Sequence, residues 1–94
     1  MARGRVRNQS RMSTLDSVKR VLRDTLQLGD RAERFDAATP LLGSLPELDS
    51  MAVVGVIAAL EEAFGLVVED DEISAEAFET VGSLSAFIER KMAA

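Results

Sequence analysis

Few residues in this chain could take part in chemistry, and a serine at the start of an apolar stretch has the best-defined setting. Ser50 follows Asp49, at the point where a long connecting segment ends. A serine or aspartate at such a junction caps a helix by accepting a backbone hydrogen bond, which stabilises the helix by about 1 kcal/mol. A helix N-terminus also carries partial positive charge and free N–H donors, which favour a bound phosphate. The local pattern favours a capping role for Ser50 and leaves an attachment point as the alternative.

The composition argues against catalysis by the chain itself. The 94 residues include no histidine and no cysteine, so the usual partner of a catalytic serine, a thiolate nucleophile and the commonest zinc ligands are absent. Asp49 is too weak a base to activate the Ser50 hydroxyl. The acidic run 69–72 lacks the spacing and central glycine of a calcium-binding loop. We therefore expect no enzyme and no metal site, with residues 69–72 forming a solvated acidic loop.

Charge is distributed unevenly along the chain. The net charge is −5, yet residues 1–23 carry seven basic side chains and one acidic, whereas residues 47–89 carry eleven acidic side chains and no basic one. An acidic surface of this kind repels nucleic acid and anionic membranes and attracts basic protein surfaces. No apolar run approaches the roughly 20 residues that span a bilayer, and no signal-peptide pattern opens the chain. We expect a cytoplasmic monomer without a membrane span.

The length predicts a single domain, preceded by a short basic segment. Residues 1–12 show no apolar periodicity, so we expect a disordered arm there and a folded domain over residues 13–94. Four arginines in the arm could bind nucleic acid. The simpler interpretation is an upstream start ahead of Met12, which we favour, and we expect no nucleic-acid partner.

Hydrophobic periodicity predicts an all-α fold, a small four-helix bundle with three longer helices and one short one. The first helix is expected over residues 14–28, with Gly29 at its end, and a long loop over residues 29–49. A second helix is expected over residues 50–64. Four apolar side chains should attach the loop to the core: Phe35, Leu41, Leu42 and Leu45.

The remaining segments follow from turn and capping signals. Gly65 should end the second helix, and residues 66–68 should form an extended connector because no partner strand exists for them. A short helix is expected over residues 74–79, with Phe78 facing inward. Thr80 should cap the last helix. The apolar face of that helix is supplied by Val81, Leu84, Phe87, Ile88 and Met92.

The helix over residues 50–64 has an outer face that is unexpectedly free of charge as far as residue 60, and negative charges resume at Glu61 and Glu62. One arc of this helix carries a sufficient core stripe, made of Val53, Val56, Ile57, Leu60 and Phe64. The opposite arc carries Met51, Gly55, Ala58 and Glu62. Methionine adapts to varied partners, and small residues allow close approach, so we favour a docking surface. The alternative is a helix buried on both sides, for which a small domain has little material.

Two motifs resemble those of acyl carrier proteins. The chain contains an Asp-Ser-hydrophobe triplet at the start of the second helix and a Leu-Glu-Glu-x-Phe segment at its end, in Asp49-Ser50-Met51 and Leu60-Glu61-Glu62-Ala63-Phe64. The similarity extends over about residues 13–92, through Ile73, Thr80-Val81, Leu84, Phe87-Ile88 and Lys91. The distances between these motifs make the resemblance specific, and it reverses the preference at Ser50 in favour of an attachment point.

The resemblance implies a carrier rather than an enzyme. A phosphopantetheinyl transferase would move 4′-phosphopantetheine from coenzyme A to Ser50, and the thiol of that arm would carry acyl groups as thioesters. Partners would be an acyl-loading enzyme and an acyltransferase or synthase with a basic docking surface. The expected docking residues are Asp49, Met51, Gly55, Ala58, Glu61 and Glu62.

Departures from the family pattern bear on the pathway. Ala52 and Gly55 occupy positions that are often acidic in members of fatty-acid synthesis, and no glycine precedes the Asp-Ser pair within five residues. These differences indicate a specialised carrier rather than the housekeeping one. Fatty-acid, polyketide and lipid-modifying pathways all remain open. The alternative function is an unmodified acidic interaction module that docks through the same helix face, with Ser50 as a cap.

Overall fold

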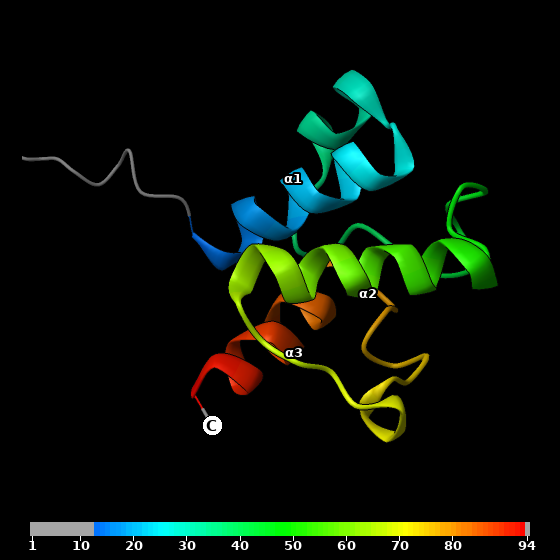
Figure 1. The fold of residues 1–94 in the computed structure, drawn as a ribbon. Helices are drawn as coiled ribbons and strands as arrows, with labels where there is room; N and C mark the ends of the chain where they lie inside the picture. The colour runs from blue at the N-terminus through cyan, green and yellow to red at the C-terminus, as the bar shows by residue number, and fades with distance from the viewer. Residues whose placement is uncertain (1–12, 94) are drawn as a thin grey trace, which may run out of the picture.

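Three long helices form the body of the molecule in the computed structural model, which describes residues 13–93 (Figure 1). α1 spans Thr14–Leu26, α2 spans Ser50–Phe64 and α3 spans Val81–Ala93. Two short 3₁₀ helices, η2 (Gly29–Arg34) and η3 (Asp70–Glu72), interrupt the connections. The predicted small all-α bundle is confirmed. The predicted arm of residues 1–12 lies outside the described residues.

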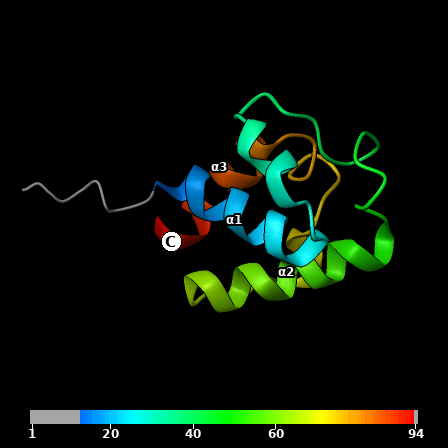
Figure 2. The same cartoon turned by 90° about the horizontal axis from the view of Figure 1, so that it is seen from above.

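The three helices are not equally in contact. α1 packs against both α2 and α3, whereas α2 and α3 have few direct contacts with each other. The view from above shows α1 running beside α2, with α3 partly behind α1 (Figure 2). The core is therefore built around buried apolar residues of α1, led by Val18 and Leu22, which are fully buried. No helix within residues 13–93 combines the length and apolarity needed to cross a membrane.

α1 begins where the sequence predicts and ends two residues earlier. The Ser13 hydroxyl accepts a hydrogen bond from the Asp16 N–H at 3.1 Å and caps the helix. Gln27 adopts a left-handed backbone conformation with φ 56°, and the Leu28 N–H donates to the Arg23 carbonyl at 2.9 Å. Leu28 is buried and closes this end. The prediction that the helix continues to residue 28 is wrong, because Gln27 already takes the left-handed conformation that ends the helix, and Gly29, with φ 60°, begins η2.

α2 has the predicted boundaries. The Asp49 carboxylate caps its first turn, and Gly65 ends it with φ 65°, a conformation that glycine adopts without steric cost. Within the predicted core stripe, Val56, Ile57 and Leu60 are buried. The two outer members of the stripe, Val53 and Phe64, pack against the core while remaining half-buried.

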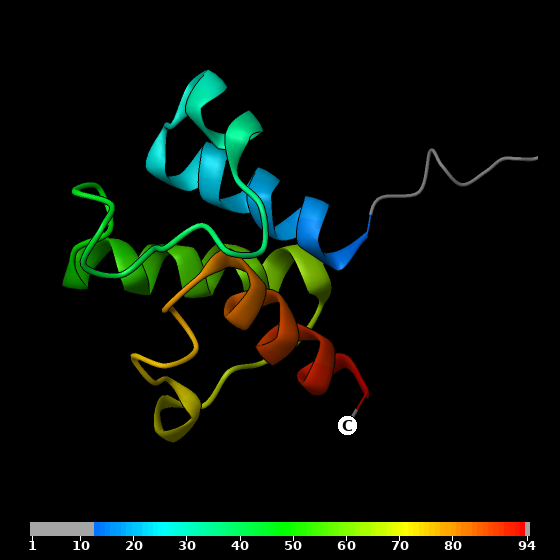
Figure 3. The ribbon, with the colours of Figure 1, turned by 180° about the vertical axis from the view of Figure 1, so that it is seen from behind.

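The long connection between α1 and α2 runs back across the molecule and pairs with the start of α3 (Figure 3). The Leu41 N–H donates to the Glu79 carbonyl at 2.9 Å, and the Val81 N–H donates to the Thr39 carbonyl at 3.0 Å. Leu41 is fully buried, as predicted. Because neighbouring residues of an extended segment point to opposite sides, Leu42 faces outward and is 40% exposed. The prediction that Leu42 packs in the core is wrong.

Phe35 and Leu45, the other two loop residues predicted to pack inward, lie against the core and are half-buried. The loop is also more regular than predicted, because η2 occupies its first six residues.

The segment predicted as a short helix over residues 74–79 forms a run of tight turns. The Ser74 hydroxyl accepts from the Ala77 N–H at 3.2 Å, and the Phe78 N–H donates to the Ala75 carbonyl at 3.1 Å. The Glu79 N–H likewise donates to the Glu76 carbonyl at 3.2 Å, so both bonds reach back three residues rather than the four of an α-helix. The carbonyls of Phe78 and Glu79 accept from the long connection. Phe78 is buried, as predicted. Thr80 caps α3 as predicted, since its hydroxyl accepts from the Ser83 N–H at 3.0 Å.

Gly82 permits the close approach between the long connection and α3. Its N–H donates to the Ala37 carbonyl at 2.8 Å, and a Cβ at this position would lie 2.8 Å from the same oxygen. We expect Gly82→Ala to lower the free energy of unfolding by about 1–2 kcal/mol, because one of the two backbones must move. Urea unfolding monitored by circular dichroism measures this change.

Gly55→Ala is the matched control for this prediction. A Cβ at Gly55 would meet only the Thr25 methyl group at 3.7 Å, an ordinary contact. The substitution should raise the free energy of unfolding by about 1 kcal/mol through helix propensity. Equal stability of Gly82→Ala and the unchanged protein would contradict the close approach.

Candidate functional site

Ser50 is the first residue of α2, and its side chain is exposed. The capping role belongs to its neighbour, because Asp49 Oδ1 accepts the hydrogen bond from the Ala52 N–H at 2.8 Å. The Ser50 hydroxyl makes no hydrogen bond to any other residue in the described range 13–93. Asp49 and Ser50 therefore have separate roles: the aspartate stabilises the helix end, and the serine hydroxyl remains free.

The backbone that carries Ser50 is held on its N-terminal side. Leu48 is buried, and its N–H donates to the Leu45 carbonyl at 3.0 Å. The Glu47 carboxylate forms a two-point ion pair with the Arg31 guanidinium of η2, and the Nη2–Oε1 distance is 3.1 Å. Both contacts fix the last turn of the connection before the helix. A free hydroxyl on a fixed backbone is accessible to an external enzyme at a defined position.

An apolar hollow opens beside Ser50. Its volume is about 320 Å³, within the lower range of small-molecule sites. Three segments enclose it: the first turns of α2, the long connection and the turns before α3. The lining side chains are Leu42, Leu48, Asp49, Ser50, Val53, Ile73, Ser74, Ala75 and Phe78. Ser50 therefore lies at the edge of a hollow that an apolar group can occupy.

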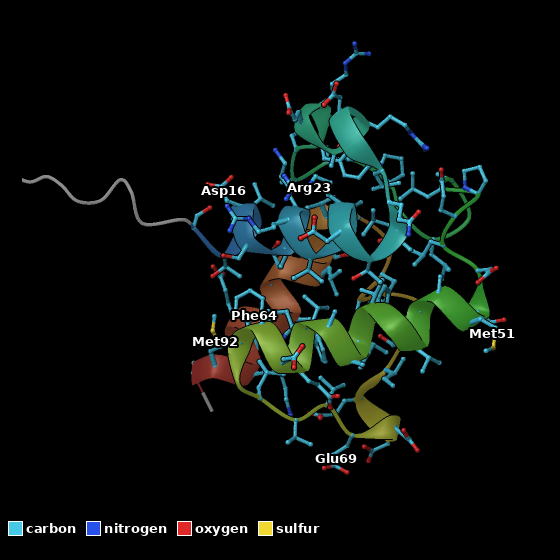
Figure 4. All side chains as sticks on the ribbon, turned by 45° about the horizontal axis from the view of Figure 1, so that its top comes forward. Asp16, Arg23, Met51, Phe64, Glu69 and Met92 are labelled. Atoms are coloured by element: carbon cyan, nitrogen blue, oxygen red, sulfur yellow. The ribbon has the colours of Figure 1, made fainter. Side chains whose placement is uncertain are left out.

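The outer face of α2 carries most of the residues predicted for docking. Met51 is 79% exposed at one end of the helix, and Gly55, Ala58 and Glu62 are also exposed. Figure 4 shows Met51 and Phe64 at opposite ends of α2. The alternative of a helix buried on both sides does not hold, because all four of these residues are exposed.

Two residues of α2 differ from the sequence-based interpretation. Glu61 is half-buried, and its Oε2 accepts a hydrogen bond from the Val68 N–H at 2.8 Å, so this carboxylate holds the connector after α2. Val54 is 64% exposed and was not among the predicted docking residues. On a helical wheel Val54 falls between the core stripe and the outer face, which was the available signal for its exposure.

Residues 69–72 are more ordered than a solvated acidic loop. The Glu69 and Glu72 side chains form a capping box around η3, in which Glu72 Oε1 accepts from the Glu69 N–H at 2.9 Å. Lys91 of α3 places its Nζ 2.7 Å and 2.9 Å from the two Glu72 oxygens. Within the described part of the chain, no group of acidic side chains is arranged to hold a metal ion.

These hydrogen bonds change the acidity of two carboxylates. The hydrogen bond from Lys91, followed by that from the Glu69 N–H, holds the pKa of Glu72 below its usual value. The hydrogen bond from Arg31 lowers the pKa of Glu47 in the same way and raises that of Arg31. A lowered carboxylate pKa stabilises the fold at pH values above the unfolded pKa, and this contribution is lost as the pH falls through the folded pKa.

Glu72→Gln tests this linkage. The variant should be less stable than the unchanged protein at neutral pH, and its stability should fall less between about pH 6 and pH 3. Urea midpoints measured across this pH range give the comparison. Glu76→Gln is the control, because Glu76 is exposed and forms no ion pair within residues 13–93. Parallel pH curves for Glu72→Gln and the unchanged protein would refute the assigned role of the ion pair.

The start of α2 fits a covalently attached phosphate. The Ser50 hydroxyl is free, and the N–H groups of Ser50 and Met51 donate to no acceptor within the described residues. Unpaired N–H groups and the helix dipole both favour a negative charge at this end. Ser50 could hold the group through its oxygen, with the first turn of α2 stabilising the phosphate charge.

Comparison with known proteins agrees with this arrangement. Residues 16–88 match the family model described as a phosphopantetheine attachment site. A solution structure of a holo acyl carrier protein from Nitrosomonas europaea superposes with a TM-score of 0.82 at 54% sequence identity. The match covers 88% of this chain and 100% of that one. No curated protein matches the sequence significantly.

The family match covers well over half of the chain, and the structural match extends over the whole of the related protein. Both agree with a helical fold that carries a prosthetic group and performs no catalysis of its own. The cofactor of this family is covalently attached 4′-phosphopantetheine. The chain therefore belongs to the phosphopantetheine-attachment family, as an acyl carrier protein.

Proposed function

We propose that Ser50 is the attachment point of 4′-phosphopantetheine and that the arm presents acyl thioesters to partner enzymes. One observation carries the proposal: Asp49 takes the capping hydrogen bond, which leaves an exposed and unpaired Ser50 hydroxyl at the edge of an apolar hollow. A serine kept only as a helix cap would use its oxygen for the cap. The free hydroxyl favours a carrier over an unmodified interaction module.

The attachment step is catalysed by a separate transferase. The Ser50 oxygen attacks the phosphorus that bears pantetheine in coenzyme A, forming a new P–O bond. The bond from that phosphorus to the remaining nucleotide bisphosphate breaks, and the hydroxyl proton passes to a base of the transferase. A chain without cysteine has no thiol of its own, and without histidine it lacks the commonest general base. The attached arm supplies the thiol that forms the thioester.

The hollow beside Ser50 supports an acyl group as the cargo. Leu42, Val53, Ala75 and Phe78 give it an apolar lining, and burial of a methylene group in such a lining is favourable by about 0.8 kcal/mol. We place the carrier in a fatty-acid, polyketide or lipid-modifying pathway of the cytoplasm, working as a monomer. The uncharged stretch over residues 50–60 supports a dedicated pathway rather than the housekeeping one.

The partner enzymes meet the outer face of α2. Met51, Gly55 and Ala58 provide an apolar strip, and carboxylates lie at both ends, with Asp49 at one and Glu61 and Glu62 at the other. A transferase, an acyl-loading enzyme and an acyltransferase or synthase with basic surfaces fit this strip. Asp49 and Glu61 each use one oxygen within the fold, whereas both oxygens of Glu62 are left for an ion pair across the interface.

Incubation with coenzyme A and a promiscuous phosphopantetheinyl transferase tests the attachment. We expect the intact mass to rise by one phosphopantetheine group and Ser50→Ala to abolish the gain. Ser44→Ala is the matched control, because Ser44 is an exposed serine of the preceding connection whose hydroxyl makes no hydrogen bond within residues 13–93. An unmodified chain under conditions that modify another carrier would favour the interaction module instead.

Charge reversal at Glu62 tests the docking face. Glu62→Lys should slow transfer of phosphopantetheine to Ser50 by about tenfold, since like charges then face each other across the interface. The free energy of unfolding should change by no more than about 0.5 kcal/mol, because Glu62 is exposed. Glu33→Lys on η2 is the control for net charge. Equal transfer rates for both variants would remove Glu62 from the docking face.

A further inference from the structure

Two hollows lie along α2, and one residue lines both. The first is the hollow of about 320 Å³ beside Ser50. The second has a volume of about 330 Å³ and lies further along the helix. Its lining consists of Val54, Ile57, Ala58, Glu61, Val68, Asp70 and Ile73. Ile73 is the residue common to both linings, so its side chain stands between them.

α2 offers an apolar path from one hollow to the other. Val53 lines the first and Ile57 the second, and these residues are one helical turn apart on the same side. In Figures 1 and 4 the segment that contains η3 runs beside α2, on the side opposite α1. An extended chain that enters beside Ser50 and follows α2 therefore meets Ile73 before it reaches the second hollow.

The backbone that carries Ile73 is held in place. Its side chain is half-buried against the core, and its N–H donates to the Asp70 carbonyl at 3.3 Å. The preceding residue, Glu72, is fixed by the capping box of η3 and by the ion pair with Lys91. The backbone at Ile73 is thus tied to α3, which makes the side chain a defined wall.

We propose that Ile73 selects the length of the acyl cargo by closing the far end of the hollow beside Ser50. This inference rests on the proposed attachment at Ser50. A methylene group takes roughly the volume of a water molecule, about 30 Å³, so the first hollow accommodates on the order of ten carbon groups. Chains beyond that length must leave part of their carbons in solvent. Shortening Ile73 joins the two hollows and roughly doubles the available space.

Protection of the thioester measures how much cargo is enclosed. Each methylene that leaves water favours the enclosed state by about fourfold, the equivalent of ~0.8 kcal/mol. The apo protein is loaded by a promiscuous transferase with hexanoyl, decanoyl or hexadecanoyl coenzyme A. The rate of thioester cleavage by hydroxylamine is then compared with that of the same acyl-pantetheine in solution.

For the unchanged protein, protection of the thioester from hydroxylamine should increase from the hexanoyl to the decanoyl form. It should not increase further for the hexadecanoyl form. For Ile73→Ala, hexadecanoyl should be protected at least about fourfold more than decanoyl. Val67→Ala is the matched control, because Val67 lies on the same connection, is 65% exposed and lines neither hollow. Its profile should follow that of the unchanged protein.

Three results would overturn the proposal. The first is that protection depends on acyl length in the same way in Ile73→Ala and in the unchanged protein, and the second is that the unchanged protein protects the hexadecanoyl thioester more than the decanoyl thioester. The third is that Val67→Ala gains the same extra protection of the hexadecanoyl thioester as Ile73→Ala. Circular dichroism establishes that each variant is folded. If Ile73→Ala unfolds, Ile73→Val replaces it and should shift the profile in the same direction by a smaller amount. Failure of the proposed function is seen earlier and separately, as absence of any mass gain on loading.

Discussion

The arrangement of this molecule depends on the backbone hydrogen bonds that join the long connection to the start of α3. α1 packs against both α2 and α3, and the bonds from the Leu41 N–H to the Glu79 carbonyl and from the Leu42 N–H to the Phe78 carbonyl fix the long connection against the segment before α3. The same bonds place the Leu42 and Phe78 side chains in the wall of the hollow beside Ser50. The interaction that closes the fold therefore also builds the cargo space, and Gly82 is required because the two backbones come so close.

Different residues of α2 pack in the core and form an exposed surface. Its buried stripe anchors the helix to α1, while its outer face carries apolar and small residues that are exposed. The ion pairs that involve acidic residues near α2 lie outside this helix. Glu47 pairs with Arg31 in the connection before α2, and Glu72, in the connection after it, pairs with Lys91. This division suits a carrier, because the chain provides a fixed point of attachment and a surface, while the partner enzymes provide the catalytic groups.

Helices whose ends are marked by local capping residues could be predicted from the sequence. Features that depend on contacts between distant segments were predicted less well. α2 was predicted with correct ends because the Asp49-Ser50 pair and Gly65 carry strong capping signals, although the local pattern favoured Ser50 as the cap and the structure gives that role to Asp49. The end of α1 was misjudged because Gln27 took a left-handed conformation that is usually filled by glycine. The predicted short helix forms turns, in which the Phe78 and Glu79 N–H groups donate to carbonyls three residues back, and the next segment pairs with the long connection. Glu61 accepts a hydrogen bond from the Val68 N–H, and Ile73 lies between two hollows. Both features depend on how the segment after α2 folds back, and the periodicity of hydrophobic residues carries no information about that.

The claim that the free oxygen at the start of α2 bears the prosthetic arm is tested most directly on the protein made in its native cells. Intact and fragment mass spectrometry of the purified chain measures what is attached and to which residue. The account predicts a phosphopantetheine group on the fragment that contains Ser50, with or without an acyl group on its thiol. A native chain with the unmodified mass, or with the group on another residue, would contradict it.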